Sequence, residues 1–152
     1  MNRTFWDRWA RFYDLAERSN HRAYAGAAAR VAELVPEGGR VLDCAAGTGT
    51  FSLAAAKRAG SVLCTDQSEA MLDKARKKAA KMGLDNISFA GRDITALSDP
   101  DGAFDAVIAA NVLHLLLQPE IAVRELWRVT APADGLSCPP SCKERWGPLT
   151  GR

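Results

Sequence analysis

The 152-residue chain has few of the features that mark a membrane protein, a secreted protein or a nucleic-acid-binding domain. Its apolar runs are all much shorter than the roughly 18 residues that a membrane-spanning helix needs. Charged side chains within residues 1–8 predict that no signal peptide is present. The net charge of +2 provides no electrostatic attraction for nucleic acid. The composition therefore predicts a single cytoplasmic domain with no membrane span and no nucleic-acid partner.

Cysteine is scarce, and its four positions do not fit a disulfide framework. Cys44 and Cys64 fall on predicted buried strands, where cysteine serves as a small apolar residue. Cys138 and Cys142 have no second pair and lack the CxxC spacing that favours zinc. We therefore expect neither disulfide bonds nor a bound metal ion.

The most informative segment is the glycine-rich turn of residues 41–52, Val-Leu-Asp-Cys-Ala-Ala-Gly-Thr-Gly-Thr-Phe-Ser. Its apolar start predicts the end of a buried parallel strand, and its last residues predict the start of a helix. The small residues Ala45, Gly47 and Gly49 allow a ligand to approach the backbone closely. A strand, a glycine turn and a helix in this order predict a nucleotide-type site at the carboxyl end of the strand.

Three further predicted strands also lead to polar residues. Residues 61–66 end at Asp66, whose carboxylate can accept hydrogen bonds from both hydroxyls of a ribose. The next strand leads to Asp93, and the fourth leads to Asn111 and His114. Because the carboxyl ends of parallel strands meet at one edge of a sheet, we expect these side chains to surround one ligand.

Strands and helices alternate along the chain, which predicts the α/β class with a doubly wound, mainly parallel sheet and helices on both faces. The predicted helices are residues 5–18, 21–35, 51–59, 69–82 and 119–129, and the predicted strands are residues 40–44, 61–65, 87–91 and 104–110. Asp105 is expected to cap or turn into the last strand and to have no chemical role.

The pattern Asp-x-Ala-x-Gly-x-Gly at residues 43–49 resembles the first motif of class I S-adenosylmethionine-dependent methyltransferases, which has glycine at the position of Ala45. The resemblance covers residues 5–132 and implies a Rossmann-like domain. It also implies S-adenosylmethionine as cofactor and a small-molecule methyl acceptor, which the sequence does not identify. The segment Phe12-Tyr13-Asp14 is similar to the start of the ubiquinone/menaquinone-biosynthesis-like and "type 11" members.

The resemblance implies roles for the residues on the methionine side of the cofactor. Gly47 and Gly49 would pass close to the methionine and ribose. Asp43 would hold the amino group directly or through water, and the backbone carbonyl of Asn111 would face the same ammonium. Tyr13, on an N-terminal helix, would close over the cofactor.

The resemblance implies a second set of roles on the adenosine side. Asp66 would bind the ribose diol, with Gln67 beside it and Met71 near the adenine. Asp93 and the backbone N–H of Ile94 would read the edge of the adenine ring.

Methyl transfer needs mainly the correct position of the two reactants, so no catalytic pair is required. His114 is the single candidate for a general base, needed only if the acceptor must lose a proton. The alternative that His114 is structural or solvent-facing stays open.

Two other functions also stay open. A dinucleotide-binding oxidoreductase would agree with Asp66, but Ser52 stands where the third glycine of its fingerprint is needed. A non-catalytic remnant of a cofactor domain is the other alternative.

After Pro132 the sequence departs from the family, which continues with Pro-Gly-Gly and an apolar fifth strand. Residues 133–143 contain adjacent prolines and no strand pattern. A one-base shift of compatible codons would restore both features, so we hypothesise that residues from about 133 are out of frame. The alternative is a divergent natural tail.

These patterns divide the chain into N-terminal helices at residues 1–36, a cofactor-binding core at 37–132 and an irregular tail at 133–152. We expect the fold to lack the last strands of the family. The intact family form is expected to be a monomer. In this chain an unpaired edge at residues 106–110 would allow self-association.

Overall fold

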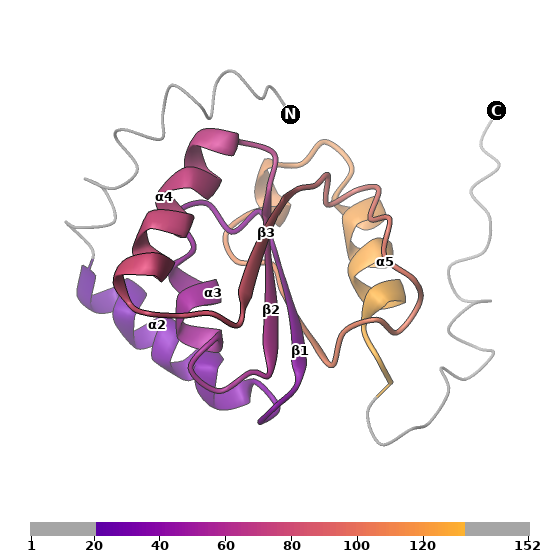
Figure 1. Cartoon of the computed structure of the whole chain (residues 1–152). Helices are drawn as coiled ribbons and strands as arrows, with labels where there is room; N and C mark the ends of the chain where they lie inside the picture. Colours follow the sequence, from indigo (N-terminus) through magenta and orange to yellow (C-terminus); the bar gives the residue numbers. More distant parts are fainter. Residues whose placement is uncertain (1–20, 133–152) are drawn as a thin grey trace, which may run out of the picture.

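The computed structural model describes residues 21–132, with the side chains of residues 21–23 excepted. These residues form a four-stranded parallel sheet with helices on both faces (Figure 1), which confirms the predicted α/β class. The predicted helix at 5–18, Tyr13 and the tail from residue 133 lie outside the described residues. Among the described helices, none has the length and apolar composition to cross a membrane.

The elements alternate as predicted. In chain order they are α2 (His21–Leu34), β1 (Arg40–Cys44), α3 (Thr50–Ala55), β2 (Ser61–Asp66), α4 (Glu69–Lys81), β3 (Ile87–Gly91), β4 (Ala106–Ile108), the 3₁₀ helix η1 (Leu113–Leu115) and α5 (Pro119–Val129). The strands lie in the order β3-β2-β1-β4. Strands β2 and β3 therefore follow one another on one side of β1, and β4 lies on the other side of β1. Ligands of open α/β sheets bind at the carboxyl ends of the strands, where the order reverses in this way.

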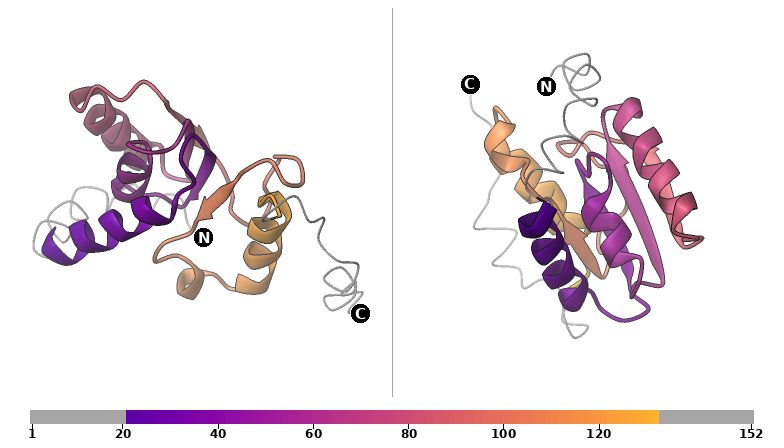
Figure 2. Two further views of the ribbon diagram at one scale, coloured as in Figure 1. Left: turned by 90° about the horizontal axis from the view of Figure 1, so that it is seen from below. Right: turned by 90° about the vertical axis from the view of Figure 1, so that its left-hand side faces the viewer.

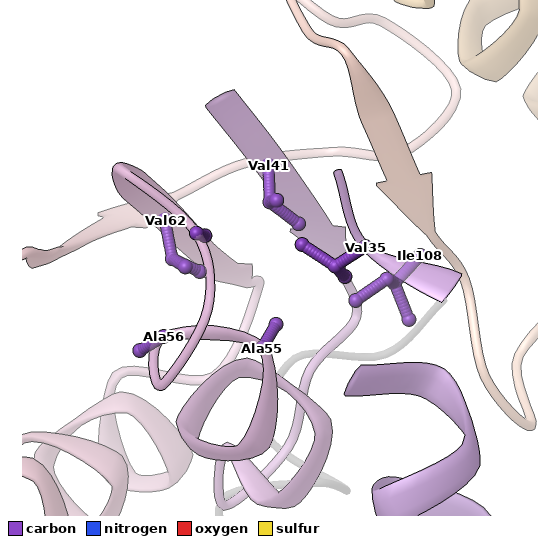
Figure 3. Close-up of a cluster of buried hydrophobic side chains, with 7 residues drawn as sticks. Val35, Val41, Ala55, Ala56, Val62 and Ile108 are labelled. Atoms are coloured by element: carbon purple, nitrogen blue, oxygen red, sulfur yellow. The ribbon is translucent and has the colours of Figure 1, made fainter. Parts of the chain in front are cut away.

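Two apolar layers hold the helices against the sheet, and β1 contributes to both because its successive side chains point to opposite faces. Val41 packs on one face with Val35, Val62, Ala55 at the end of α3 and Ala56 just after it (Figure 3). Leu42 packs on the other face with residues that include Ala122 of α5. Figure 2 shows α2 and α4 on one side of the sheet and α5 on the other.

Two elements are shorter than the sequence pattern indicates. Strand β4 covers Ala106–Ile108 instead of residues 104–110, because only Val41, Leu42 and Asp43 of β1 pair with it. Helix α3 ends at Ala55, where the chain turns toward β2, and η1 was not predicted.

Asp105 lies at the bend that leads into β4, as the sequence predicted, and it also pairs with Arg40, which the sequence did not predict. Its carboxylate accepts hydrogen bonds from the backbone N–H of Arg40 at 2.8 Å and from the Arg40 guanidinium at 3.0 and 3.2 Å. The guanidinium of Arg40 holds the pKa of Asp105 below its usual range. The pair joins the starts of β1 and β4 at the edge opposite the carboxyl ends of the strands.

At the edge of the sheet away from β1, the residues just before β4 pair with the chain after α5. Phe104 and Thr130 form an isolated parallel bridge. In it the N–H of Phe104 donates to the carbonyl of Val129 at 3.0 Å, and the N–H of Ala131 donates to the carbonyl of Phe104 at 2.6 Å. Within residues 21–132, no strand pairs with the outer edge of β4, the edge away from β1, beyond this bridge.

Candidate functional site

A pocket lies at the carboxyl ends of β1 and β4, where the strand order reverses. Its walls come from the glycine-rich turn, the start of α3, the end of β4 and one side chain of α2. The lining residues are Tyr24, Asp43, Ala45, Ala46, Gly47, Thr48, Thr50, Phe51, Ala110 and Asn111. Four of the predicted site residues are therefore brought together here: Asp43, Ala45, Gly47 and Asn111.

Asp43 is the buried acid of this pocket, with 1% of its surface exposed. Its Oδ2 accepts a hydrogen bond from Ser52 Oγ at 2.5 Å. Its Oδ1 is buried and has no hydrogen-bond partner among the described residues. Burial raises the pKa of Asp43 to about 7, against the opposing hydrogen bond from Ser52. A buried carboxylate oxygen without a partner is costly, and a ligand that donates to it would remove this cost.

Burial of Asp43 makes the free energy of unfolding depend on pH. Because its pKa is raised on folding, the folded chain keeps a proton that the unfolded chain loses, so the free energy of unfolding falls as pH rises from about 4 to about 7. We expect Asp43→Asn to remove about 2–3 kcal/mol of this fall between pH 5 and 8, measured by urea unfolding without ligand.

Asp105→Asn is the matched control, because the pKa of Asp105 is lowered and its carboxylate stays charged in both states over this pH range. An unchanged pH profile in the Asp43 variant would show that Asp43 is ionised in the folded chain at pH 5.

The turn after β1 requires left-handed backbone at three positions. Gly47 has φ 56° and Gly49 has φ 81°. Ala45 has φ 53°, which side chains with a Cβ rarely adopt. A Cβ on Gly49 would lie 2.8 Å from the Cβ of Ala75, so α4 packs directly on the turn. The turn is thereby held close to the sheet, with its backbone beside the pocket.

The strain at Ala45 leads to a stability prediction. We expect Ala45→Gly to raise the free energy of unfolding by up to about 1 kcal/mol, because glycine removes a left-handed strain that exceeds its entropic cost. Equilibrium urea unfolding measures this change. Ala46→Gly serves as the control: Ala46 has no positive φ and packs against Cys64, Leu72 and Ala75, so glycine there should only destabilise. Equal losses in the two variants would contradict the prediction.

Asp66 connects β2 to the glycine turn. Its Oδ2 accepts from the N–H of Gly47 at 2.9 Å, and its Oδ1 accepts from the N–H of Ser68 at 2.8 Å. Ser68 in turn caps α4 by accepting from the N–H of Met71. The acid at the end of β2 thus fixes the relative positions of the turn and the start of α4.

The predicted adenine residues lie farther along the strand ends and do not line the pocket. Asp93 is exposed, and hydrogen bonds from Thr95 hold its pKa below the usual range, with a further hydrogen bond from Gln67. The side chain of Ile94 is 4% exposed and packs in the layer under α5, so only its backbone can face a ligand. Met71 is also buried, with 2% exposed.

The sequence analysis missed Tyr24, whose hydroxyl accepts a hydrogen bond from Asn111 Nδ2 at 3.3 Å. No local motif marks this residue, because the contact joins α2 to the loop after β4. Asn111 itself has φ 60°, a left-handed conformation that asparagine tolerates. His114 is exposed on η1 and does not line the pocket.

The buried cysteines behave as the sequence predicted. Burial raises the pKa of Cys44 and of Cys64 to about 12, so both remain thiols at neutral pH. Both are free cysteines with 0% exposure. Across residues 21–132, no group of three or more His, Cys, Asp or Glu side chains is arranged to hold a metal ion.

Comparisons with known proteins agree with this geometry. The model of a family described as "Methyltransferase domain" matches residues 41–133. Demethylmenaquinone methyltransferase of Thermus thermophilus is 41% identical over 113 residues, which cover 71% of this chain and 51% of that protein. The 23S rRNA (uracil(1939)-C(5))-methyltransferase RlmD of Alkalilimnicola ehrlichii is 41% identical over 78 residues, which cover 49% of this chain and 18% of that protein.

A solved structure of a SAM-dependent methyltransferase from Aquifex aeolicus has a TM-score of 0.58 and 29% identity, with 64% of this chain and 54% of that chain covered. The chain spans about half the length of the Thermus and Aquifex proteins. These similarities imply S-adenosylmethionine as the cofactor and do not favour a dinucleotide-binding oxidoreductase. Because the family model covers more than half of its residues, the chain belongs to the class I S-adenosylmethionine-dependent methyltransferases.

Proposed function

We propose that this chain binds S-adenosylmethionine in the pocket between β1 and β4 and forms the cofactor-binding part of an enzyme that methylates a small molecule. The observation that carries the proposal is Asp43, whose buried Oδ1 lacks a partner among the described residues and whose side chain lines the pocket. The cofactor carries an ammonium group, which would supply the missing hydrogen bond together with an opposite charge.

The proposed site extends from this acid along the strand ends. Gly47 and Gly49 would let the methionine and ribose approach the turn, and Asp66 would bind the ribose diol. An ionised carboxylate has about four acceptor positions, so Asp66 can hold the N–H groups of Gly47 and Ser68 and still accept from a ligand. The adenine would reach Asp93 and the N–H of Ile94, with Gln67 and Met71 beside it.

The chemistry requires little from the protein beyond position. When bound, S-adenosylmethionine supplies an electrophilic methyl group on a sulfonium. The pocket would hold that group in line with the acceptor and exclude water, which lowers the barrier by orientation. His114 would serve as a base only for an acceptor that must lose a proton.

The relatives differ in their acceptors: by their names, one acts on demethylmenaquinone and the other on a ribosomal RNA. We favour a small molecule because the net charge of +2 is only a small excess of positive charge for binding an RNA backbone. A cytoplasmic location is part of this proposal.

Isothermal calorimetry with S-adenosylhomocysteine and with NAD tests the cofactor. Binding of S-adenosylhomocysteine alone is the expected result. Binding of NAD alone would favour the oxidoreductase, and binding of neither ligand would favour a non-catalytic remnant. A methyl-transfer assay with small-molecule and RNA acceptors then tests the acceptor class.

Self-association through β4 is a further part of the proposal. The N–H groups of Ala106 and Ile108 point to the outer edge, because that of Asp105 donates inward to Arg40 and successive groups alternate. Such an edge can pair with a second chain. Sedimentation velocity is expected to show a concentration-dependent dimer.

Ala106→Pro should abolish this dimer, since it removes an outward N–H and leaves the pairing with β1 intact. A monomer in the parent chain, or a dimer that survives in the variant, would contradict edge pairing.

A further inference from the structure

The hydrogen bond between Tyr24 and Asn111 is a polar contact at the pocket that the roles above do not use. It joins α2 to the loop after β4, two segments far apart in the sequence. Both side chains line the same pocket as Asp43.

The direction of this hydrogen bond decides what Tyr24 can do. An amide Nδ2 can only donate, so the Tyr24 oxygen is the acceptor in the 3.3 Å contact. The O–H proton of Tyr24 is therefore directed elsewhere. Within residues 21–132 this hydroxyl forms no hydrogen bond besides the contact with Asn111, so its proton is available to a ligand.

The charges of the pocket limit which ligand group can use that proton. Among the described residues that line the pocket, Asp43 is the one carboxylic acid, and none is Lys, Arg or His. Within this described lining, an anionic group can be bound only by neutral donors. The hydroxyl of Thr48 accepts from Lys78 Nζ at 2.8 Å, and Thr48 is only 2% exposed, so it offers almost no surface to a ligand. A phenol O–H is a strong donor to a carboxylate, because the acceptor is charged.

We propose that Tyr24, oriented by Asn111, binds the carboxylate of the cofactor's methionine group while Asp43 binds its ammonium. The proposal rests on the cofactor binding proposed above. The two charged groups are attached to one carbon atom, so their partners must line one pocket, as Tyr24 and Asp43 do. Tyr24 is thus a binding residue that discriminates an α-amino acid group from a simple amine.

Calorimetry with two ligands tests the proposal. S-adenosylhomocysteine carries both charged groups, and its decarboxylated analogue carries only the ammonium. Tyr24→Phe is expected to weaken S-adenosylhomocysteine about tenfold and to change the affinity for the decarboxylated analogue less than about twofold. Asn111→Gly, which keeps the left-handed backbone and removes the amide, is expected to give a smaller loss with the same ligand dependence.

The outcomes separate this inference from the cofactor proposal. If the parent chain binds S-adenosylhomocysteine and Tyr24→Phe binds it equally well, or loses both ligands to the same degree, Tyr24 does not bind the carboxylate and the cofactor proposal stands. If the parent chain binds neither ligand, both proposals fail. Urea midpoints of the variants, expected to match the parent, exclude unfolding as the cause of a loss.

Discussion

Replacing Gly49 by alanine is expected to lower the free energy of unfolding by about 2–5 kcal/mol. Two costs add at this position. The φ of 81° disfavours any residue with a Cβ, at about 1–2 kcal/mol. The new Cβ would also lie 2.8 Å from that of Ala75, and such overpacking costs about 1–3 kcal/mol. Equilibrium urea unfolding measures the sum.

Gly83→Ala separates the two costs. Gly83 has φ 67°, but a Cβ there would meet nothing within 4 Å. Its substitution should therefore cost only the backbone strain. The difference between the two variants is the cost of pushing α4 away from the glycine turn. If the two losses are equal, the contact between Gly49 and Ala75 does not hold the turn in place.

Replacing Asp66 by alanine is expected to weaken binding of S-adenosylhomocysteine by about 2–3 kcal/mol, because it removes a charged acceptor for two ribose hydroxyls. The same change frees the N–H of Gly47, which Asp66 holds at 2.9 Å, so part of the loss could come through the turn. Calorimetry measures the total loss of affinity. A second ligand is needed to separate the loss of the ribose contact from the effect on the turn.

An analogue that lacks the ribose 2′-hydroxyl makes this division. If Asp66 binds the ribose, Asp66→Ala should weaken the analogue much less than S-adenosylhomocysteine. Equal losses for both ligands would assign the effect to the turn. Asp105→Ala is the control for general destabilisation, since Asp105 pairs with Arg40 at the opposite end of the strands. An unchanged dissociation constant in the Asp66 variant would show that this acid is not at the ribose.

The sequence predicted best where local chemistry decides the structure. Strand β1 was predicted at its observed bounds, Arg40–Cys44, because a short apolar run meets a glycine turn at its end. Helix α4 begins as predicted after Ser68, which caps it. Strand β4 was predicted too long, because its length depends on how much of β1 it can pair with, and that is a property of the sheet.

In the site, too, the features that depend on local sequence could be predicted, and the contacts between distant segments could not. The acids and glycines of the strand ends follow from their positions along the chain, and four of the predicted residues do line the pocket. The contacts between distant segments have no local signal: Tyr24 with Asn111, and Lys78 with Thr48. The left-handed backbone of Ala45 did have a signal, since the family has glycine at this position.

The bridge between Phe104 and Thr130 determines which residues of a strand that continues along β4 direct their N–H and C=O groups toward it. Phe104 exchanges hydrogen bonds with residues 129 and 131, so the odd-numbered positions face β4 and the even-numbered positions face away. Pro132, which has no N–H, falls on an outward-facing position. Proline at this point therefore removes no hydrogen bond to β4. It acts instead on the far side, where it withholds a donor from any strand that would be the next neighbour in the sheet.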